Sequence, residues 1–344
     1  MAPTVVNICF ALVRWTPVLF ITAVIVWSYY AYVIQMCLFS ISNIPEKIIY
    51  LFIYHPILFI FCWAYWKTIF TETGTVPKEV RLTRCVSYRT ISQCFSFIYL
   101  GVNWSSLKMT KMKKVRKNFW RVLLVDYPFS VQPVRYCEKC KCIKPDRAHH
   151  CSVCGKCNLK MDHHCPWVNN CVCFTNYKFF VLFLGYGLLY CAWIASTSIQ
   201  YFIKFWTGVS GSDRNLSNLH VVFLFFASIM FSISLLSLFG YHLFLVCSNR
   251  STLETFRAPI FRGGPDKDGF SLGRKGNFIE VFGDSTAKWF LPLFTSFGDG
   301  VNYPVRTIDE DYDTLLGQRQ RWMEDGTAEE DNSPGFDNSS LEQT

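Results

Sequence analysis

The stretch from Cys137 to Cys173 reads CEKCKCIKPDRAHHCSVCGKCNLKMDHHCPWVNNCVC and contains nine of the chain's 16 cysteines and four of its 7 histidines. Cysteines spread over a small secreted chain are typical of a disulfide scaffold, whereas cysteines clustered with histidines are typical of metal sites. We therefore interpret this stretch as a metal-binding region and not as a set of disulfides.

Within this stretch the spacing Cys-x2-Cys-x9-His-x6-Cys occurs twice, and the second copy begins fourteen residues after the first. Three thiolates and one imidazole suit tetrahedral Zn²⁺, and four protein ligands leave no position open for water or substrate. We expect two structural zinc ions that help polar loop segments to fold. The two ligand sets are Cys137, Cys140, His150 and Cys157, and Cys151, Cys154, His164 and Cys171.

Three residues of the second copy are not needed for metal binding. Cys165 stands fourteen residues after Cys151, where a third copy would begin, but the next cysteine of that copy is replaced by valine. Asp162 and His163 precede it in the same segment. An acid, an imidazole and a thiol can form an activated nucleophile, in which the carboxylate orients the imidazole and the imidazolium lowers the thiol pKa. The alternative is that Asp162 and His163 only hydrogen-bond to a zinc ligand.

The chain as a whole has the composition of a membrane protein. Its hydrophobic share of 51% excludes a soluble globular protein. Four apolar runs are each long enough to cross about 30 Å of hydrocarbon, which takes roughly twenty residues. They cover residues 17–38, 48–66, 179–203 and 221–247. The expected fold is therefore an all-α membrane protein of four transmembrane helices, with a cytosolic cysteine-rich zinc-binding domain between helices two and three.

The charge distribution predicts how the chain is oriented. The net charge of +9 arises mainly from the segment between the second and third apolar runs, whereas the connections after the first and third runs are nearly uncharged. By the positive-inside rule, this middle segment and both termini lie in the cytosol. We attribute the basic stretch to the cytosolic membrane face and expect no nucleic-acid partner. The first run is too long for a signal peptide, so we expect it to remain as a helix.

The sequence divides into six expected parts. Residues 81–130 combine a short apolar stretch with a basic one, which favours a position on the membrane surface, with disorder as the alternative. The tail is too polar to bury enough surface to fold. The expected parts are helices one and two at 1–66, a basic cytosolic segment at 67–130, the cysteine-rich catalytic domain at 131–177, helices three and four at 178–247, a cytosolic C-terminal region at 248–308 and a disordered tail at 309–344.

The four residues Asp162-His163-His164-Cys165, inside this cysteine pattern and between the second and third apolar runs, resemble the signature of the DHHC-type protein palmitoyltransferases. Within that family, helices one, three and four look closest to member twenty, with members two and fifteen near. Further similarity lies in KPDR at 144–147, in NYKFF at 176–180, in Ser251-Thr252-Leu253-Glu254, which resembles a T-T-x-E motif, and in Asn277 with VFG at 281–283, which is similar to a C-terminal motif.

The resemblance implies an activity and roles for several residues. Cys165 would take a fatty acyl group from palmitoyl-CoA or another long-chain acyl-CoA and pass it to juxtamembrane cysteines of membrane proteins. His163 would be the base, Asp162 its orienting partner and Thr252 a hydrogen-bonding support for that pair. The alternative for Thr252 is an N-cap of a short helix. The resemblance also implies residence in the Golgi, perinuclear or plasma membrane.

Two polar side chains fall at matching depths in the first and third apolar runs. At a rise of about 1.5 Å per residue, Ser28 lies roughly 16 Å and Tyr190 roughly 18 Å from the cytosolic surface. Polar groups in hydrocarbon seek partners, so a hydrogen bond between them could close the far end of an acyl-chain cavity, and the resemblance points the same way. Trp167, beside the nucleophile, is a further expected lining residue. The alternative is ordinary packing between a serine and a tyrosine.

Some residues depart from the family pattern, and two other functions are compatible with parts of the sequence. The sequence has TETG at 71–74 in place of Asp-Pro-Gly, Ser251 in place of threonine and Cys173 in place of glycine, and 81–130 is unlike the family. A catalytically silent zinc-binding membrane adaptor is the alternative function. A transporter is disfavoured because His55 and His242 are almost the only ionisable residues within the spans, and we interpret both as packed or interfacial.

Overall fold

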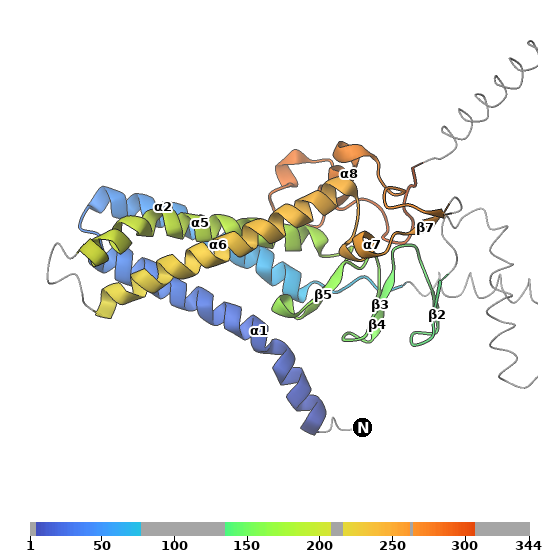
Figure 1. Cartoon of the computed structure of the whole chain (residues 1–344), viewed down its shortest axis with the longest axis horizontal. Helices are drawn as coiled ribbons and strands as arrows, with labels where there is room; N and C mark the ends of the chain where they lie inside the picture. Colours follow the sequence, from blue (N-terminus) through green and yellow to red (C-terminus); the bar gives the residue numbers. More distant parts are fainter. Residues whose placement is uncertain (1–4, 77–134, 208–215, 262–263, 307–344) are drawn as a thin grey trace, which may run out of the picture. The chain divides into compact units, whose positions relative to one another are not determined.

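The computed structural model describes residues 5–76, 135–207, 216–261 and 264–306 (Figure 1). The chain divides into two compact units, residues 1–304 and 305–344, and every element named below belongs to the first unit. Most of the basic segment expected at 67–130 and all of the tail expected at 309–344 lie outside the described residues.

Four long helices account for the four apolar runs. Within the described residues, four helices are long and apolar enough to cross a membrane, with mean hydropathy between 1.8 and 2.5 over their most apolar windows. They confirm the expected fold class, and each exceeds the predicted run by several residues. The helices are α1 (Val5–Tyr29), which continues as the π-helix η1 (Tyr30–Ser40), α2 (Ile44–Phe70), α5 (Tyr177–Thr207) and α6 (Leu216–Ser248).

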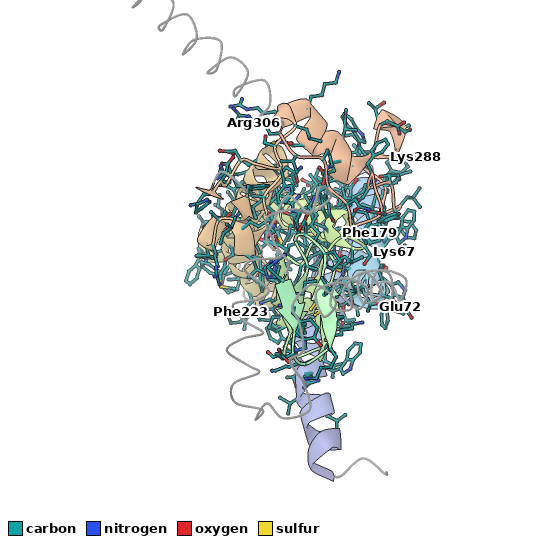
Figure 2. All side chains as sticks on the ribbon, turned by 90° about the vertical axis from the view of Figure 1, so that its right-hand side faces the viewer. Lys67, Glu72, Phe179, Phe223, Lys288 and Arg306 are labelled. Atoms are coloured by element: carbon teal, nitrogen blue, oxygen red, sulfur yellow. The ribbon has the colours of Figure 1, made fainter. Side chains whose placement is uncertain are left out.

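Helices α2, α5 and α6 run alongside one another in Figure 1, and α5 contacts both of the others. Small residues allow membrane helices to approach closely. A Cβ atom at Gly187 of α5 would lie 3.1 Å from the Phe61 ring on α2 and 3.3 Å from Leu235 on α6. At the end of the bundle next to the cysteine-rich segment, Lys67 of α2 lies 5.6 Å from the centroid of the Phe179 ring on α5 (Figure 2).

The cysteine-rich segment folds as three successive antiparallel hairpins. They are β1 (Arg135–Cys137) with β2 (Cys142–Lys144), β3 (His149–Cys151) with β4 (Lys156–Asn158), and β5 (His163–Cys165) with β6 (Asn170–Val172). Each hairpin starts fourteen residues after the previous one. The last turn residue is left-handed in all three, with φ of 51° at Lys141, 68° at Gly155 and 45° at Asn169. The fourteen-residue register of the sequence is therefore the repeat of a hairpin. The hairpin occurs three times, whereas the four-ligand pattern occurs twice.

The C-terminal region packs on the end of α6. It contains α7 (Thr252–Phe256), the short hairpin of β7 (Ile260–Phe261) and β8 (Gly264–Pro265), α8 (Gly273–Phe282) and the 3₁₀ turn η6 (Thr286–Lys288). Asn277 donates to the Cys247 carbonyl at 2.7 Å and accepts from the Leu272 N–H at 2.7 Å, which ties α8 to α6. Gly283 has φ of 84°, and a Cβ there would lie 2.7 Å from the Thr295 carbonyl oxygen. The fold therefore explains why asparagine stands at 277 and glycine at 283 in the C-terminal motif.

The sequence departures at 71–74 and 173 are accommodated in the hairpin region. Leu159 N–H donates to the Gly74 carbonyl at 2.9 Å, and Thr75 forms an isolated bridge with Asn158. Cys173 is buried, with its Sγ 3.5 Å from the Thr175 hydroxyl. The segment after α2 is therefore bound to the second hairpin without the Asp-Pro-Gly sequence.

Candidate active site

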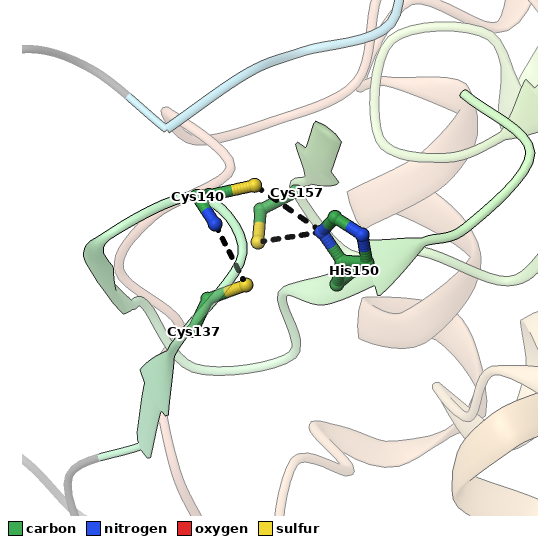
Figure 3. Close-up of side chains that lie close together, drawn as sticks. All are labelled: Cys137, Cys140, His150 and Cys157. Atoms are coloured by element: carbon green, nitrogen blue, oxygen red, sulfur yellow. Dashed lines mark hydrogen bonds between the residues drawn. The ribbon is translucent and has the colours of Figure 1, made fainter. Parts of the chain in front are cut away.

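The first two hairpins and part of the third bring the two predicted ligand sets together. In each set the four ligand atoms all lie within 4.8 Å of one another. Figure 3 shows the first set, in which His150 Nδ1 lies 3.2 Å from Cys140 Sγ and 3.8 Å from Cys157 Sγ. In the second set, Cys154 Sγ lies 3.4 Å from both His164 Nδ1 and Cys171 Sγ. The side chains that the sequence pattern groups are thus neighbours in space.

The donor chemistry of both clusters fits a bound metal ion. A tetrahedral ion with metal–sulfur bonds of about 2.3 Å places neighbouring sulfur atoms about 3.8 Å apart, close to the separations found here. The hairpins also pair ligands directly, because His150 stands opposite Cys157 and His164 opposite Cys171. Each cluster can therefore hold one metal ion, and four protein donors leave no position for a substrate.

The third hairpin has the same shape but no ligand set of its own. Cys165 occupies the place that Cys137 and Cys151 occupy in the other two hairpins, and buried Val168 stands where the second cysteine ligand would be. Cys165 belongs to neither metal cluster. The structural repeat therefore leaves one buried thiol without a metal partner set.

This third hairpin is attached to the end of α2. The Asn170 amide donates to the carbonyls of Thr68 at 3.2 Å, Ile69 at 3.1 Å and Thr71 at 2.9 Å, groups that a helix end leaves without partners. The Tyr65 hydroxyl donates to the Trp167 carbonyl at 2.9 Å. These bonds place the Cys165 hairpin directly against a membrane helix.

Asp162 is a buried carboxylate with partners on both oxygens. His163 Nδ1 lies 2.6 Å from its Oδ2, the Thr252 hydroxyl donates to Oδ2 at 2.8 Å and the Thr252 N–H donates to Oδ1 at 2.8 Å. Burial alone would raise the pKa of Asp162, but the hydrogen bonds and the charge of His163 outweigh it and lower the pKa. The carboxylate is therefore held ionised and oriented toward the imidazole.

His163 joins this carboxylate to the thiol. Burial disfavours a charged imidazole, but Asp162 and Cys165 more than compensate and raise the pKa of His163 to about 9. Because Nδ1 lies next to the Asp162 carboxylate, Nε2 is the ring nitrogen available for a hydrogen bond with Cys165. An acid, an imidazole and a thiol in this order form an arrangement that can generate and stabilise a thiolate.

The two residues that could cap helix α7 have separate roles. The Ser251 hydroxyl accepts from the Glu254 N–H at 3.2 Å, and Glu254 Oε2 accepts from the Ser251 N–H at 2.9 Å, which is a capping box. Thr252 is the first residue inside the helix, and its hydroxyl donates to Asp162 instead. Serine in place of the family's threonine therefore keeps the cap.

A buried cluster of charges, which sequence reasoning missed, holds α7 against the hairpins. Arg147, on the turn before β3, makes a bidentate ion pair with Glu254, with N···O distances of 2.8 and 2.7 Å. Lys160, just before the Asp162 segment, pairs with Glu280 of α8 at 2.6 Å. Asn249 lies between the two pairs and accepts from Arg147 Nη1 at 2.8 Å. KPDR and S-T-x-E are distant in sequence, so only the fold could reveal this contact.

His242 lies closer to Asp162 and His163 than the sequence suggested. Its side chain is buried, as expected of a packed residue, and its ring centroid lies 5.9 Å from that of His163. One ring nitrogen of His242 lies within 4.8 Å of a carboxylate oxygen of Asp162 and of a ring nitrogen of His163. The Tyr177 hydroxyl is 3.2 Å from its Nδ1. The only sequence signal was its position near the end of the fourth span.

A column of aromatic rings leads from the third hairpin into the helix bundle. The rings of Tyr65, Phe183, Phe61 and Tyr190 stack in that order, with centroid distances of 4.9, 5.7 and 5.5 Å. At the far end, the hydroxyls of Tyr190 and Ser28 lie 2.8 Å apart, and both side chains are buried. The structure thus brings together the pair that the depth argument matched.

Trp167 lies at the other end of the column, where its backbone carbonyl accepts from Tyr65. Its side chain is 52% exposed, and its ring centroid lies 6.4 Å from that of Phe20 on α1. Trp167 therefore faces outward beside α1, whereas Ser28 and Tyr190 are inside the bundle.

Comparison with known proteins agrees with this site. The family model described as DHHC palmitoyltransferase matches residues 131–258. The human palmitoyltransferase ZDHHC2 is 48% identical over 307 residues, which cover 88% of this chain and 78% of that protein. Human ZDHHC20 is 48% identical over 315 residues, 90% of this chain and 82% of the relative. ZDHHC20-A of Danio rerio is 47% identical over 330 residues, 95% and 88% of the two chains.

These matches identify the class of protein that the four helices and the cysteine-rich hairpins define. The chain belongs to the DHHC palmitoyltransferase family. It is a multi-pass membrane protein with two clusters that can bind metal ions.

Proposed function

We propose that this protein is a protein S-acyltransferase that moves a long-chain acyl group from acyl-CoA, through a thioester on Cys165, to cysteines of membrane-associated proteins. The observation that carries the proposal is the arrangement of Asp162, His163 and Cys165, with Thr252 bonded to the carboxylate. Membership of the DHHC palmitoyltransferase family supports the same reaction class.

The chemistry follows from these groups in two steps. His163 takes the proton of Cys165, and the thiolate attacks the thioester carbonyl carbon of acyl-CoA. The bond between that carbon and the CoA sulfur breaks, and the proton held by His163 passes to the CoA sulfur, so that CoA leaves as a thiol. His163 then takes the proton of a substrate cysteine thiol, and the substrate sulfur attacks the acyl-Cys165 carbonyl carbon. The bond between that carbon and the Cys165 sulfur breaks, and Cys165 leaves as a thiolate that recovers the proton from His163. Each step exchanges one thioester for another, so no ATP is required.

The two metal clusters are proposed to hold structural Zn²⁺. Three cysteines and one histidine are a common ligand set for structural zinc, and borderline-soft zinc suits thiolate and imidazole donors. When bound, the ions supply cross-links between hairpins whose strands are only three residues long. The ligand sets surround the segment that carries Asp162 and Cys165, so we propose that they position it.

The helix bundle is proposed to bind the acyl chain. The aromatic column between Tyr65 and Tyr190 offers an apolar lining, and the bond between Ser28 and Tyr190 marks a polar end to it. Burying a sixteen-carbon chain contributes on the order of 10 kcal/mol at about 0.8 kcal/mol per methylene. Trp167 is proposed to line the entrance and not the far end, because its side chain is exposed.

The site is proposed to face the cytosol, with both chain termini on that side, because the cysteine-rich segment belongs to the connection between the second and third spans, and that connection as a whole carries most of the basic residues. Substrate cysteines would then lie next to the membrane in other proteins, close to the end of α2. The Golgi, perinuclear and plasma membranes remain the proposed locations.

One experiment separates this function from a zinc-binding adaptor. Purified protein is incubated with labelled palmitoyl-CoA, and the label on Cys165 is measured before and after hydroxylamine treatment, which cleaves thioesters. The proposed function requires a hydroxylamine-sensitive adduct on Cys165. An adaptor that keeps Cys165 idle would bind zinc and show no adduct.

A further inference from the structure

Three hydroxyl groups from three helices meet inside the bundle. Tyr190 of α5 lies 2.8 Å from Ser28 of α1 and 2.8 Å from Tyr54 of α2, measured between hydroxyl oxygens. The side chains of Ser28 and Tyr190 are 5% exposed, and that of Tyr54 is 0% exposed. Sequence reasoning paired Ser28 with Tyr190 but did not involve Tyr54.

The direction of these hydrogen bonds follows from counting protons, since each hydroxyl has one. Among the described residues, the hydroxyl of Tyr54 has Tyr190 as its hydrogen-bond partner, so Tyr54 must donate to Tyr190 if its buried proton is to be satisfied. Tyr190 then donates to Ser28. Ser28 in turn donates to the Ile25 carbonyl at 2.8 Å. Every proton is used once, and the three hydroxyls form a one-way relay that begins at Tyr54.

Tyr54 is well fixed for the role of first donor. Its ring stacks on that of Tyr32, with a centroid distance of 4.4 Å and an interplanar angle of 11°. The Tyr32 hydroxyl lies 3.0 Å from that of Thr197 on α5 and takes no part in the hydrogen bonds among Ser28, Tyr54 and Tyr190, so Tyr32 contributes to the position of Tyr54 through its ring. The Tyr190 oxygen therefore accepts from Tyr54, whose ring is held by stacking, while the Tyr190 hydroxyl proton points at Ser28.

We propose that Tyr54 is a positioning residue that sets acyl-chain length by orienting Tyr190. The proposal rests on the proposed function, in which Ser28 and Tyr190 form the far end of the acyl site. If only Ser28 bonded to Tyr190, movement of one of these side chains could open the far end of the acyl site. The additional hydrogen bond from Tyr54 holds the Tyr190 hydroxyl between α1 and α2. Loss of the Tyr54 hydroxyl should loosen the closure and admit longer chains without removing any ring.

The test compares Tyr54→Phe with Tyr32→Phe. Both changes remove one hydroxyl from a buried tyrosine that bonds to α5, but only Tyr54 belongs to the relay. Each protein is given equal palmitoyl-CoA and stearoyl-CoA, and the two adducts on Cys165 are quantified by mass spectrometry. Tyr54→Phe should raise the stearoyl to palmitoyl ratio about fivefold, the effect of one ordinary hydrogen bond. Tyr32→Phe should leave the ratio as in the wild type.

A double variant tests whether Tyr54 acts through Tyr190. In the Tyr190→Phe background the relay is already broken, so adding Tyr54→Phe should not change the ratio further. An unchanged ratio in Tyr54→Phe, an equal change in Tyr32→Phe, or additive changes in the double variant would each overturn the proposal. If the wild-type protein forms no adduct at all, the proposed function fails. If it forms the adduct and the ratio ignores Tyr54, only this inference fails.

Discussion

Thr252 makes two hydrogen bonds to Asp162, one from its backbone N–H and one from its hydroxyl, and both are 2.8 Å long. The two residues are 90 positions apart, and two membrane helices lie between them in the chain. The backbone bond does not depend on the side chain at position 252, whereas the hydroxyl bond does. Removing the Thr252 hydroxyl therefore weakens the contact between Thr252 and Asp162 without disturbing the N-cap of α7, which is Ser251.

Thr252→Ala should slow adduct formation on Cys165 roughly tenfold, because a hydrogen bond to a charged group contributes about 1.5–3 kcal/mol. Its melting temperature should fall only modestly, because Asp162 keeps its bonds to His163 and to the backbone N–H of residue 252. Ser251→Ala is the matched control, since it should lower stability by about 1 kcal/mol while turnover changes less. Melting curves and acylation rates of both variants check this. A destabilised but fully active Thr252→Ala protein would contradict the assignment.

Cys165→Ser should abolish both the acyl adduct and transfer to substrate proteins, since hydroxyl oxygen is a far weaker nucleophile than thiolate sulfur. Because Cys165 lies outside both metal clusters, the protein should keep its fold and two bound zinc ions. Adduct formation, circular dichroism and zinc content are the measurements. Continued acylation of a substrate by the pure variant would show that another residue is the nucleophile.

His163→Ala should slow adduct formation and retain metal, whereas His150→Ala and Cys154→Ala should each lose zinc and destabilise the hairpins. His163 and His150 occupy neighbouring hairpins and differ in that only His150 belongs to a four-donor cluster. Zinc content by elemental analysis, measured beside the acylation rate, distinguishes the two effects. Equal zinc loss in all three variants would refute the division between ligands and catalytic groups.

Tyr190→Ala should lengthen the acyl site and shift preference from palmitoyl-CoA toward stearoyl-CoA or longer donors. Ser28→Phe should shorten the site and favour myristoyl-CoA, because a ring would fill the space in front of the closure. Competition among acyl-CoAs of fourteen to twenty carbons gives the profile for each protein. Identical profiles for both variants and the wild type would mean that the acyl site does not end at this pair.

Glu254→Gln should lower the free energy of unfolding by about 3 kcal/mol, because it leaves the buried Arg147 guanidinium without its bidentate partner. Burial would raise the pKa of Glu254, but the charge and hydrogen bonds of Arg147 outweigh it and lower the pKa. The stabilisation is therefore complete above the ordinary glutamate pKa of about 4.3 and is lost only as pH falls through the lower folded value.

Thermal unfolding between pH 6 and 8 tests this expected pH dependence of the stabilisation by Glu254. The difference in melting temperature between wild type and Glu254→Gln should be constant across that range. A difference that shrinks steadily from pH 8 to pH 6 would indicate that another group controls the contribution. Glu138→Gln is a suitable control, since Glu138 pairs with Lys141 on the surface and should contribute little.

Local patterns account for the parts of the fold that the sequence predicts well. The four spans follow from run length, and the two clusters that could hold metal ions follow from a spacing that repeats within 35 residues, from Cys137 to Cys171. The third hairpin was harder to see, because Val168 removes a ligand while Asn169 keeps the left-handed turn. The backbone repeat thus extends further than the cysteine pattern that revealed it.

Contacts between distant segments could not be predicted in the same way. Arg147 and Glu254 are 107 residues apart, and their ion pair follows from the way α6 returns the chain to the hairpins. His242 and Tyr54 each read as one residue of an apolar helix, since neither helix periodicity nor composition says which side chain faces which helix. Pairing across two membrane crossings is a property of the bundle and has no local sequence signal.

The attachment of α7 to the hairpins also has a consequence for synthesis on the ribosome. Cys165, His163 and all the metal ligands emerge before the third span, whereas Thr252 and Glu254 emerge only after the fourth. A nascent chain in which both cysteine-histidine clusters are complete therefore still lacks the groups that bond to Asp162. If the proposed function holds, full acyl-transfer activity should therefore be reached only after the fourth membrane helix has been inserted.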